Sequence, residues 1–434
     1  MDPKAGIKLN STEELIFSSL KDFLVRNELD SVWVVGGWVR DKLLDRTSQD
    51  IDLVFPESNL AILVQGISTI FKRGRLQGQN RGVTLSSSSS QVVHTEGATS
   101  WSLHQFTLQH NQVKYKLDLR ALQGESPESD CLTRDFSINA VYYKLCSGKI
   151  DDPCGGLADL LAPQPRIRCP IAPAEAFAAS PQRLIRLLRF SVGLNAGIDP
   201  SIREFLAARK DLDELAGQLG EGQRQLLGRE LRRIFELSNA AEHLRAAREL
   251  GLHQLLAMGQ AIDPNFEKLF GLGVDLLDSI EMILARGEFR EFRQGFSISR
   301  ESKTEETRIR LVAFAFPFAR ETPGFLGRLL NETLFSQSTK DIGADYVKAF
   351  GEFAALCETK GPSQALPQDP EPFFSALLEK TLGLFSLNDF RFSIALAYFA
   401  YVIPQDAIAR FADYIANNLE QTYFEYRFRV LGIE

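Results

Sequence analysis

The sequence predicts an α+β protein in which a mixed sheet with helices packed on it is followed by an all-helical region. Short β-branched runs, bounded by Gly, Asp and Ser, occur within the first 150 residues and are typical of strands. Further along, apolar residues such as Leu184, Leu187 and Leu188 recur every three to four positions, which is the spacing of amphipathic helices. The change of pattern indicates more than one domain, and 434 residues are enough for about two to four.

Taken in chain order, the β-branched runs predict strands at residues 32–35, 51–55, 82–85, 104–108, 113–119 and 141–143. Helical spacing predicts helices at residues 12–26, 38–44 and 60–70. The serine run at residues 86–90, with the polar stretch that follows to residue 102, is of low complexity, and we expect a flexible hairpin loop there. Prolines cluster at residues 163–173 and 361–372, which are candidate linkers, and no repeat of fixed period suggests a solenoid.

Composition restricts the possible partners and the compartment. The formal net charge is −7, from 49 Lys and Arg against 56 Asp and Glu, so any contact with a nucleic acid needs a local basic patch. The longest apolar stretch, residues 392–403, is shorter than the ~20 residues that cross a bilayer, so we expect a buried helix there and no membrane partner. The first 20 residues include acidic side chains and no apolar core, which favours a cytoplasmic protein without a targeting peptide.

Cysteine and histidine usage does not indicate a metal centre. The cysteines are odd in number and lack a CxxC pair, so neither a disulfide framework nor a thiolate zinc site is indicated. We expect them to behave as small buried hydrophobes, at Cys131, Cys146, Cys154, Cys169 and Cys357. The histidines show no i, i+4 pair and no HExxH, at His94, His104, His110, His243 and His253.

The first chemical signal is a pair of glycines between a predicted strand and a predicted helix. Gly36 and Gly37 follow the strand at residues 32–35, and backbone N–H groups at such a helix start can hold a phosphate. Arg40 lies one turn into the helix and can add a guanidinium fork. A glycine pair alone is more often an ordinary tight turn, so the carboxylates that follow it decide the interpretation.

The second signal is a set of carboxylates on predicted strands. Asp50 and Asp52 alternate with Ile51, which places both carboxylates on one face of a strand. Asp118, on a neighbouring strand, is the candidate third member. Carboxylates of this kind hold Mg²⁺ together with substrate phosphates, and two Mg²⁺ ions can serve both the attacking hydroxyl and the leaving pyrophosphate. An isolated DxD can be a surface strand edge, but one that follows a GG–Arg element favours nucleotidyl transfer.

At this point the chain resembles a known family, the tRNA nucleotidyltransferases and bacterial poly(A) polymerases within the polymerase-β-like nucleotidyltransferases. Five segments between residues 36 and 190 carry the resemblance in the family's order: GGWVRD at 36–41, DID at 50–52, TRDFSINA at 133–140, DPCGGLADL at 152–160 and PQRLIRLLRF at 181–190. The resemblance implies a nucleotidyltransferase head at residues 1–160 and a helical neck with tRNA and nucleotide recognition at 161–260, and helical spacing predicts a helical body and tail of unknown detail at 261–434.

The resemblance also implies roles for individual residues. Asp50 and Asp52 would hold two catalytic Mg²⁺ ions, and Asp118 would complete the metal site or accept the proton of the 3′-hydroxyl. The remaining residues would bind the incoming nucleotide through its triphosphate or ribose: Gly36, Gly37, Arg40, Arg134, Asp135 and Asn139. The three arginines Arg183, Arg186 and Arg189 recur on one helical face and suit a polyphosphate or an RNA backbone, although a solvated basic face is the alternative.

Three features of the sequence concern the choice of nucleotide, two of them departures from the family pattern. The usual Glu-Asp before the Pro-x-x-Arg element is replaced by Ala179 and Ser180, and serine lacks a carboxylate that could accept from an exocyclic amine. Thr133 replaces the first arginine of the usual Arg-Arg-Asp. The segment between Arg120 and Arg134 is short, as in family members without the loop associated with switching from C to A addition. These departures predict weaker or different base selection and put complete CCA synthesis in question.

The sequence therefore predicts an enzyme that adds CMP, AMP or both, from CTP and ATP, to the 3′ end of tRNA. Four arginines of the neck are candidates for gripping acceptor-stem phosphates, namely Arg224, Arg229, Arg232 and Arg233. The aromatic stretches at residues 314–318 and 385–401 are expected to be core rather than a stacking platform for bases. Three alternatives stay open: a partial CC- or A-adding enzyme, a poly(A) polymerase, and a catalytically weak RNA-binding paralogue. The oligomeric state is not predicted.

Overall fold

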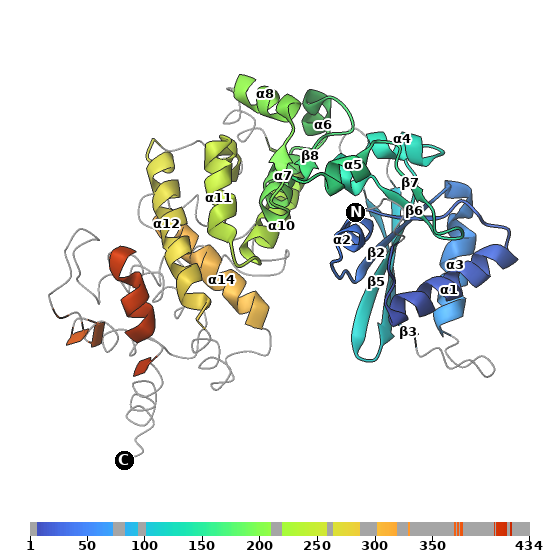
Figure 1. Ribbon diagram of the computed structural model, residues 1–434, viewed down its shortest axis with the longest axis horizontal. Coiled ribbons are helices and arrows are strands. Elements are labelled where there is room, and N and C mark those ends of the chain that lie inside the picture. Colours follow the sequence, from blue (N-terminus) through green and yellow to red (C-terminus); the bar gives the residue numbers. More distant parts are fainter. Residues whose placement is uncertain are drawn as a thin grey trace, which may run out of the picture. The chain divides into compact units, whose positions relative to one another are not determined.

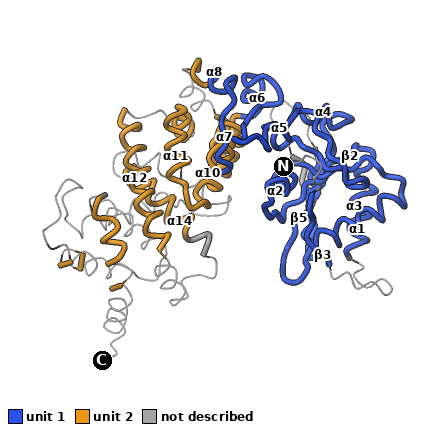
Figure 2. The backbone as a smooth tube through the Cα atoms, in the orientation of Figure 1, with its two compact units in different colours: residues 1–180, 193–205 blue, residues 181–192, 206–434 orange. Residues whose placement is uncertain are grey.

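The computed structural model describes residues 7–72, 83–93, 101–209, 219–257, 264–286 and 302–318, with short further pieces at 329, 369, 371–372, 374–375, 403, 405–414 and 417–418. The chain divides into two compact units, residues 1–180 with 193–205, and residues 181–192 with 206–434 (Figure 2). The first unit holds the sheet and the second is helical, which confirms the expected α+β class.

The first unit is built on a seven-stranded mixed sheet with the order β3-β4-β5-β2-β1-β6-β7 (Figure 1). Strand β2 pairs in parallel with β5 and antiparallel with β1, so the middle of the sheet is mixed. The strands are β1 (Trp33–Val35), β2 (Asp50–Phe55), β3 (Thr84–Val93), β4 (Trp101–His110), β5 (Val113–Ala121), β6 (Tyr142–Lys144) and β7 (Ile150–Asp151). The six strands expected from the sequence correspond to β1 to β6.

Helices α1 (Ser11–Arg26) and α3 (Leu60–Lys72) cover one face of this sheet (Figure 1). They bury a large apolar cluster against alternate strand residues such as Ile51, Leu53 and Leu117. Helix α2 (Gly37–Leu43) adds Trp38, whose indole Nε1 donates to the fully buried carboxylate of Glu13 at 3.1 Å. Together with α1 and α3, this helix confirms the three helices expected here.

The opposite face carries a smaller apolar cluster and leaves room for polar groups. It contains Trp33, Val35 and Val54 from the strands, with Tyr142 and Cys131 beside them. Further short elements of the chain are α4 (Pro127–Leu132), η2 (Ser137–Asn139), α5 (Gly156–Leu161), β8 (Arg166–Ile167), α6 (Pro173–Ala179), β9 (Gly197–Ile198) and α8 (Pro200–Ala208).

The serine run at residues 86–90 is not a loop, so the expectation of a flexible hairpin loop was wrong for these residues, while residues 94–100 of the same expectation lie outside the described residues. It lies inside β3, an edge strand that pairs antiparallel with β4 from Thr84 to Val93, with a register shift between Leu85 and Ser87. Serine is tolerated here because the side chains of residues 86–90 are exposed, and the Ser86 hydroxyl donates to the Thr107 carbonyl at 2.9 Å. Composition alone does not reveal that β4 provides hydrogen-bond partners for the backbone of the serine run.

Two further expectations are corrected by tertiary contacts. The proline-rich stretch at residues 163–173 is not a free linker, because β8 within it pairs in parallel with β9. Cys131 and Cys154 form a disulfide, whereas the sequence indicated none. Their Cα atoms are 6.4 Å apart although 23 positions separate them, and neither an odd cysteine count nor a missing CxxC can exclude such a tertiary approach.

The second unit packs helices around an aromatic core. Its helices are α7 (Gln182–Gly193), α10 (Glu221–Phe235), α11 (Ala240–Glu249), α12 (Phe266–Leu284) and α14 (Ser302–Ala315), with short turns η3 (Leu252–Ala257) and η4 (Gln405–Ala407). Phe235, Phe270 and Phe314 are fully buried, and the rings of Phe235 and Phe270 lie 5.7 Å and 5.3 Å from that of Phe314. The expectation that residues 314–318 belong to the core is confirmed.

Some expectations fall on other parts of the chain. The aromatic stretch at 385–401 lies outside the described residues, and so do nearly all of the apolar stretch at 392–403 and of the candidate linker at 361–372. Within the part of the chain that the structure describes, no helix is both long and apolar enough to cross a membrane. The three-part division at residues 160 and 260 stays a prediction.

Candidate active site

The turn between β1 and α2 requires its first glycine. Gly36 has φ +84°, a backbone conformation that residues other than glycine rarely adopt. A Cβ atom at Gly36 would lie 3.2 Å from Oδ2 of Asp52 and 3.9 Å from Nη1 of Arg134. The turn therefore brings the backbone directly against a carboxylate and a guanidinium that are distant in sequence.

The strand carboxylates meet through the parallel pairing of β2 with β5. Asp52 is in register with Asp118, and Asp50 is in register with Lys116. The carboxylate of Asp118 accepts from Lys116 Nζ at 2.7 Å and from Gln105 Nε2 at 3.2 Å. Asp50 is exposed, whereas Asp52 is half-buried. The structure thus places Asp52 and Asp118 side by side, with Asp50 one pleat away on the same face.

The burial and the neighbouring charge of Asp52 disfavour its ionisation. Burial raises the pKa of Asp52 to about 6, the charge of Asp118 adds to the rise, and Arg134 and Arg120 oppose it. A divalent cation would compensate this repulsion, and carboxylate oxygens suit Mg²⁺, so the donor chemistry fits such an ion. Among the described residues, no group of three or more His, Cys, Asp or Glu side chains is arranged to hold a metal.

Three of the candidate nucleotide-binding residues form one connected network. Arg40 Nη1 donates to Oδ1 of Asn139 at 2.7 Å, and the Asn139 amide donates to the Asp135 carboxylate at 3.0 Å. The Arg40 fork is also engaged by Asp41, at 2.9 Å from Nε and 2.7 Å from Nη2. These contacts with Asp41 and Asn139 hold the guanidinium of Arg40 in one orientation. A hypothetical Cβ at Gly37 would lie 3.6 Å from Arg40 Nη2, so the glycine pair and the arginine share one region.

The other candidate arginine of the head is held by a carboxylate that sequence reasoning missed. Asp130, in α4, is fully buried and accepts from Arg134 Nε at 2.8 Å and Nη2 at 2.7 Å. Tyr142 Oη donates to the same carboxylate oxygen at 2.7 Å, and Arg120 lies 3.6 Å away. Burial raises the pKa of Asp130, but Arg134 and Arg120 outweigh it, and the net shift is downward. The i, i+4 spacing of Asp130 and Arg134 was the available signal.

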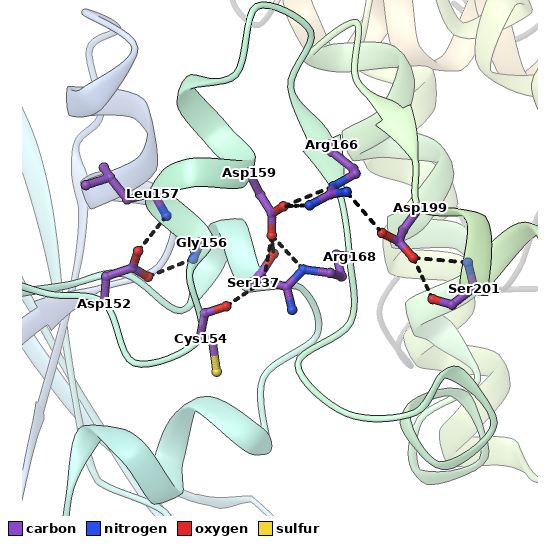
Figure 3. A network of polar contacts seen from close by, with 10 residues as sticks. All are labelled: Ser137, Asp152, Cys154, Gly156, Leu157, Asp159, Arg166, Arg168, Asp199 and Ser201. Atoms are coloured by element: carbon purple, nitrogen blue, oxygen red, sulfur yellow. Dashed lines mark hydrogen bonds and ion pairs between the residues drawn. The ribbon is translucent and has the colours of Figure 1, made fainter. Parts of the chain in front are cut away.

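A second buried carboxylate, Asp159, is the centre of a network of polar contacts (Figure 3). Its oxygens accept from the Ser137 hydroxyl at 2.6 Å, Arg166 Nη2 at 2.7 Å and Arg168 Nε at 2.9 Å. Asp152 caps the start of α5 by accepting from the backbone N–H of Gly156 at 2.7 Å. Ser137 opens the η2 turn that also contains Asn139, so the segment at 152–160 is bonded to the turn that carries a candidate nucleotide-binding residue.

The arginine trio of α7 lies in the second unit. Glu230, on α10, accepts from Arg186 Nη1 at 3.1 Å and Arg189 Nε at 3.0 Å, and from Arg233 Nη1 at 2.6 Å. Burial and the neighbouring cations Arg186 and Arg233 lower the pKa of Arg189, although Glu230 opposes this. Arg183 is half-buried on the same helix. One buried carboxylate therefore fixes three of the predicted ligand-binding arginines.

The other candidate RNA-binding arginines are spread along α10. Arg224 Nη1 donates to the Leu219 carbonyl at 2.6 Å, and Arg232 Nε lies 3.3 Å from Glu236 Oε1. Arg229 is exposed. The role of these three arginines in RNA binding stays a prediction.

Comparisons with known proteins point in one direction. Residues 32–164 match the family described as "Poly A polymerase head domain". Nucleotidyltransferase lcsQ of Purpureocillium lilacinum is 30% identical over 46% of this chain and 35% of its own length. The CC-adding tRNA nucleotidyltransferase of Geobacter sulfurreducens is 31% identical over 52% of this chain and 45% of its own length. Poly(A) polymerase I of Salmonella typhi is 28% identical over 52% of this chain and 46% of its own length. The chain thus spans less than half the length of each of these relatives.

Solved structures share the fold over nearly the whole chain. A structure described as "tRNA-processing enzyme (apo form I)" matches with a TM-score of 0.63 at 18% identity, covering 98% of both chains. A tRNA nucleotidyltransferase complexed with a primer tRNA and an incoming ATP analog matches with a TM-score of 0.59 at 19% identity, covering 93% of this chain and 99% of that one. At such identities the likeness establishes the fold.

Proposed function

We propose that the chain is a member of the family of CCA-adding tRNA nucleotidyltransferases and class I poly(A) polymerases, to which it is similar, and that it adds CMP, AMP or both to the 3′ end of tRNA. The observation that carries the proposal is the convergence of Gly36, Asp52 and Arg134 beside the central strands of the sheet. In the reaction, the 3′-hydroxyl oxygen bonds to the α-phosphorus of CTP or ATP, the bond to the β-phosphate breaks, and pyrophosphate leaves.

The carboxylates of Asp50 and Asp52 would hold two Mg²⁺ ions. Bound Mg²⁺ neutralises the charge on the triphosphate and favours ionisation of the attacking hydroxyl. Asp118 serves either as a further ligand or as the acceptor of the hydroxyl proton, and Lys116 and Gln105 hold its carboxylate in place. Arg40, Arg134 and Asn139 orient the nucleotide, which positions the reacting atoms before the bond forms.

The proposed RNA contacts lie in the second unit. Arg183, Arg186 and Arg189 contact the nucleotide or the RNA backbone, and the arginines of α10 contact phosphates of the acceptor stem. With three arginines and one carboxylate, the cluster around Glu230 keeps a positive excess that suits a polyanion despite the net charge of the whole chain.

A CC-adding enzyme is the second candidate. Ser180, half-buried at the end of α6, replaces the carboxylate that the family uses for base recognition, and the segment between Arg120 and Arg134 is short. The similarity to a CC-adding relative favours the same alternative. A hydroxyl offers one hydrogen bond where a carboxylate offers several acceptor positions, so discrimination between CTP and ATP would be weaker or differently arranged.

A substrate series separates the candidates. Purified protein is given tRNAs that end at the discriminator base, at C or at CC, with Mg²⁺ and CTP or ATP alone, and the products are sized. Extension of the first two substrates with CTP, together with extension of the CC-ending substrate with ATP, supports CCA synthesis. Extension in the CTP reactions and in none of the ATP reactions supports CC addition. Long A tails on unrelated RNA would indicate a poly(A) polymerase. No extension of any substrate, with tRNA still bound, would indicate an RNA-binding paralogue and refute the proposal.

One substitution tests the assigned carboxylate. Asp52→Asn should abolish incorporation and leave tRNA binding within about twofold of the unmodified protein, because the RNA contacts lie elsewhere. Asp45→Asn is the matched control, since Asp45 is exposed and is not among the proposed site residues. Unimpaired turnover by Asp52→Asn would remove the basis of the proposal.

A further inference from the structure

A buried carboxylate that the proposed chemistry does not use lies next to the candidate site. Asp130 is fully buried, and its Oδ2 accepts three hydrogen bonds, two from Arg134 and one from Tyr142. Its Oδ1 accepts from the backbone N–H of Gln123 at 2.9 Å. A carboxylate with this many donors is fixed in orientation, because any rotation would break charge-assisted hydrogen bonds.

These bonds determine where Arg134 points. Asp130 engages Nε and Nη2, and the third nitrogen, Nη1, is the atom that approaches Gly36, at 3.9 Å from the position of a Cβ there. The same Cβ position lies 3.2 Å from Oδ2 of Asp52. The guanidinium plane lies beside the Tyr142 ring, with 5.6 Å between its carbon and the ring centroid. The fork is therefore held on one side and presents Nη1 to the site on the other.

Arg134 has another cation and a second carboxylate nearby, Arg120 and Asp52. Arg120 is half-buried on β5, 3.6 Å from Asp130, and the charges of Arg134 and Arg120 repel each other. Asp52 attracts both cations. Without the Asp130 carboxylate, two arginines would face each other beside Asp52, and Arg134 would gain by turning toward it.

The support for Asp130 is itself rigid. Asp130 lies in α4, and the next residue, Cys131, is joined to Cys154 by the disulfide. The Thr133 hydroxyl donates to the Asp130 carbonyl at 2.8 Å, which closes the end of the helix. The carboxylate is thus anchored through its backbone as well as through its donors.

We propose that Asp130 is a positioning residue that aims Arg134 at the incoming nucleotide and keeps it from pairing with Asp52. The inference rests on the proposed function, because it takes Arg134 as a nucleotide contact. Asp130 itself does not reach the nucleotide, so its effect on binding passes entirely through Arg134.

The test measures equilibrium binding of CTP and ATP, with Mg²⁺ and without RNA, so that no turnover occurs. Asp130→Asn should weaken nucleotide binding by about tenfold or more. In an Arg134→Lys background the same change should alter the Kd by less than about threefold, because lysine has no fork for Asp130 to hold. An unchanged Kd in Asp130→Asn, or a tenfold effect that persists in the Arg134→Lys background, would overturn the inference.

Two further variants guard against a general loss of structure. Asp151→Asn is the matched control, because Asp151 also accepts from an aromatic side chain, Trp33 Nε1 at 2.7 Å, and should lower stability without changing the nucleotide Kd. If Asp130→Asn does not fold, Tyr142→Phe removes one donor and leaves the carboxylate, and it should still weaken binding severalfold. An unchanged Kd in Tyr142→Phe would then count against the inference. Failure of the unmodified protein to bind either nucleotide would refute the proposed function instead.

Discussion

Gly156 offers a sharp test of how the segment at 152–160 supports the site. A Cβ atom at Gly156 would lie 1.9 Å from the carbonyl oxygen of Ser137 and 3.0 Å from Val141 Cγ2. Ordinary contacts of this kind are about 3.5 Å, so the two backbones would have to separate by roughly 1.5 Å. The obstacle is a backbone atom that cannot rotate away, and the Ser137 turn also contains Asn139, which contacts Arg40.

The expected cost of Gly156→Ala follows from these distances. Overpacking costs about 1–3 kcal/mol, and a clash with backbone belongs at the upper end. The lower entropy of alanine in the unfolded chain offsets about 0.5–1 kcal/mol. We therefore expect a net loss of about 2 kcal/mol, which corresponds to a fall in Tm of roughly 4–8 °C for a unit of this size. Nucleotide addition should also fall, because the turn that carries Asn139 is displaced.

The assay follows tryptophan fluorescence during thermal and urea unfolding. All three tryptophans, Trp33, Trp38 and Trp101, belong to the first unit, so the signal reports that unit. Gly197→Ala is the matched control in the same unit, because a Cβ there would meet its neighbours at 3.9 Å and should change stability by less than about 1 kcal/mol. A Gly156→Ala protein as stable and as active as the control would refute the reasoning.

Three further predictions concern other parts of the chain. Reduction of the Cys131–Cys154 disulfide, which spans 23 positions, should cost the first unit about 3 kcal/mol from the entropy of the unfolded loop; equal melting curves with two additional thiols titrated would contradict it. Burial raises the pKa of Glu281 to about 7 from its ordinary value near 4.5, so the folded state binds the extra proton between these values and stability falls as pH rises from about 4.5 to 7. Calorimetry should find that the stability of Glu281→Gln depends less on pH than that of the unmodified protein. Parallel curves of stability against pH would argue against a raised pKa at Glu281. Glu230→Ala should cost about 3 kcal/mol, since it leaves Arg186 and Arg189 without their buried carboxylate, whereas Glu236→Ala, which removes a partly exposed partner of Arg232, should cost less than about 1 kcal/mol in circular-dichroism melts. Equal losses in the two variants would refute the role of Glu230.

Local chemistry explains which features could be predicted from the sequence. The Asp50-Ile51-Asp52 alternation fixes which side chains share a face, because the period of a strand is two residues. The glycine at position 36 marks a backbone that must turn with positive φ, and the structure has φ +84° there. Helices at residues 12–26 and 60–70 followed from apolar spacing, which depends only on neighbours within a few turns.

The sequence by itself determined the α+β class and the central strands, and it supplied the candidate residues for a nucleotidyl-transfer site. Only the tertiary structure decided that Asp52 lies beside Asp118, that Asp130 holds Arg134, and that Cys131 meets Cys154. It also decided that the serine run forms an edge strand rather than a loop. The physical reason is that strand pairing, burial and the choice of partner for a charged group depend on segments distant in sequence, which periodicity and composition do not record.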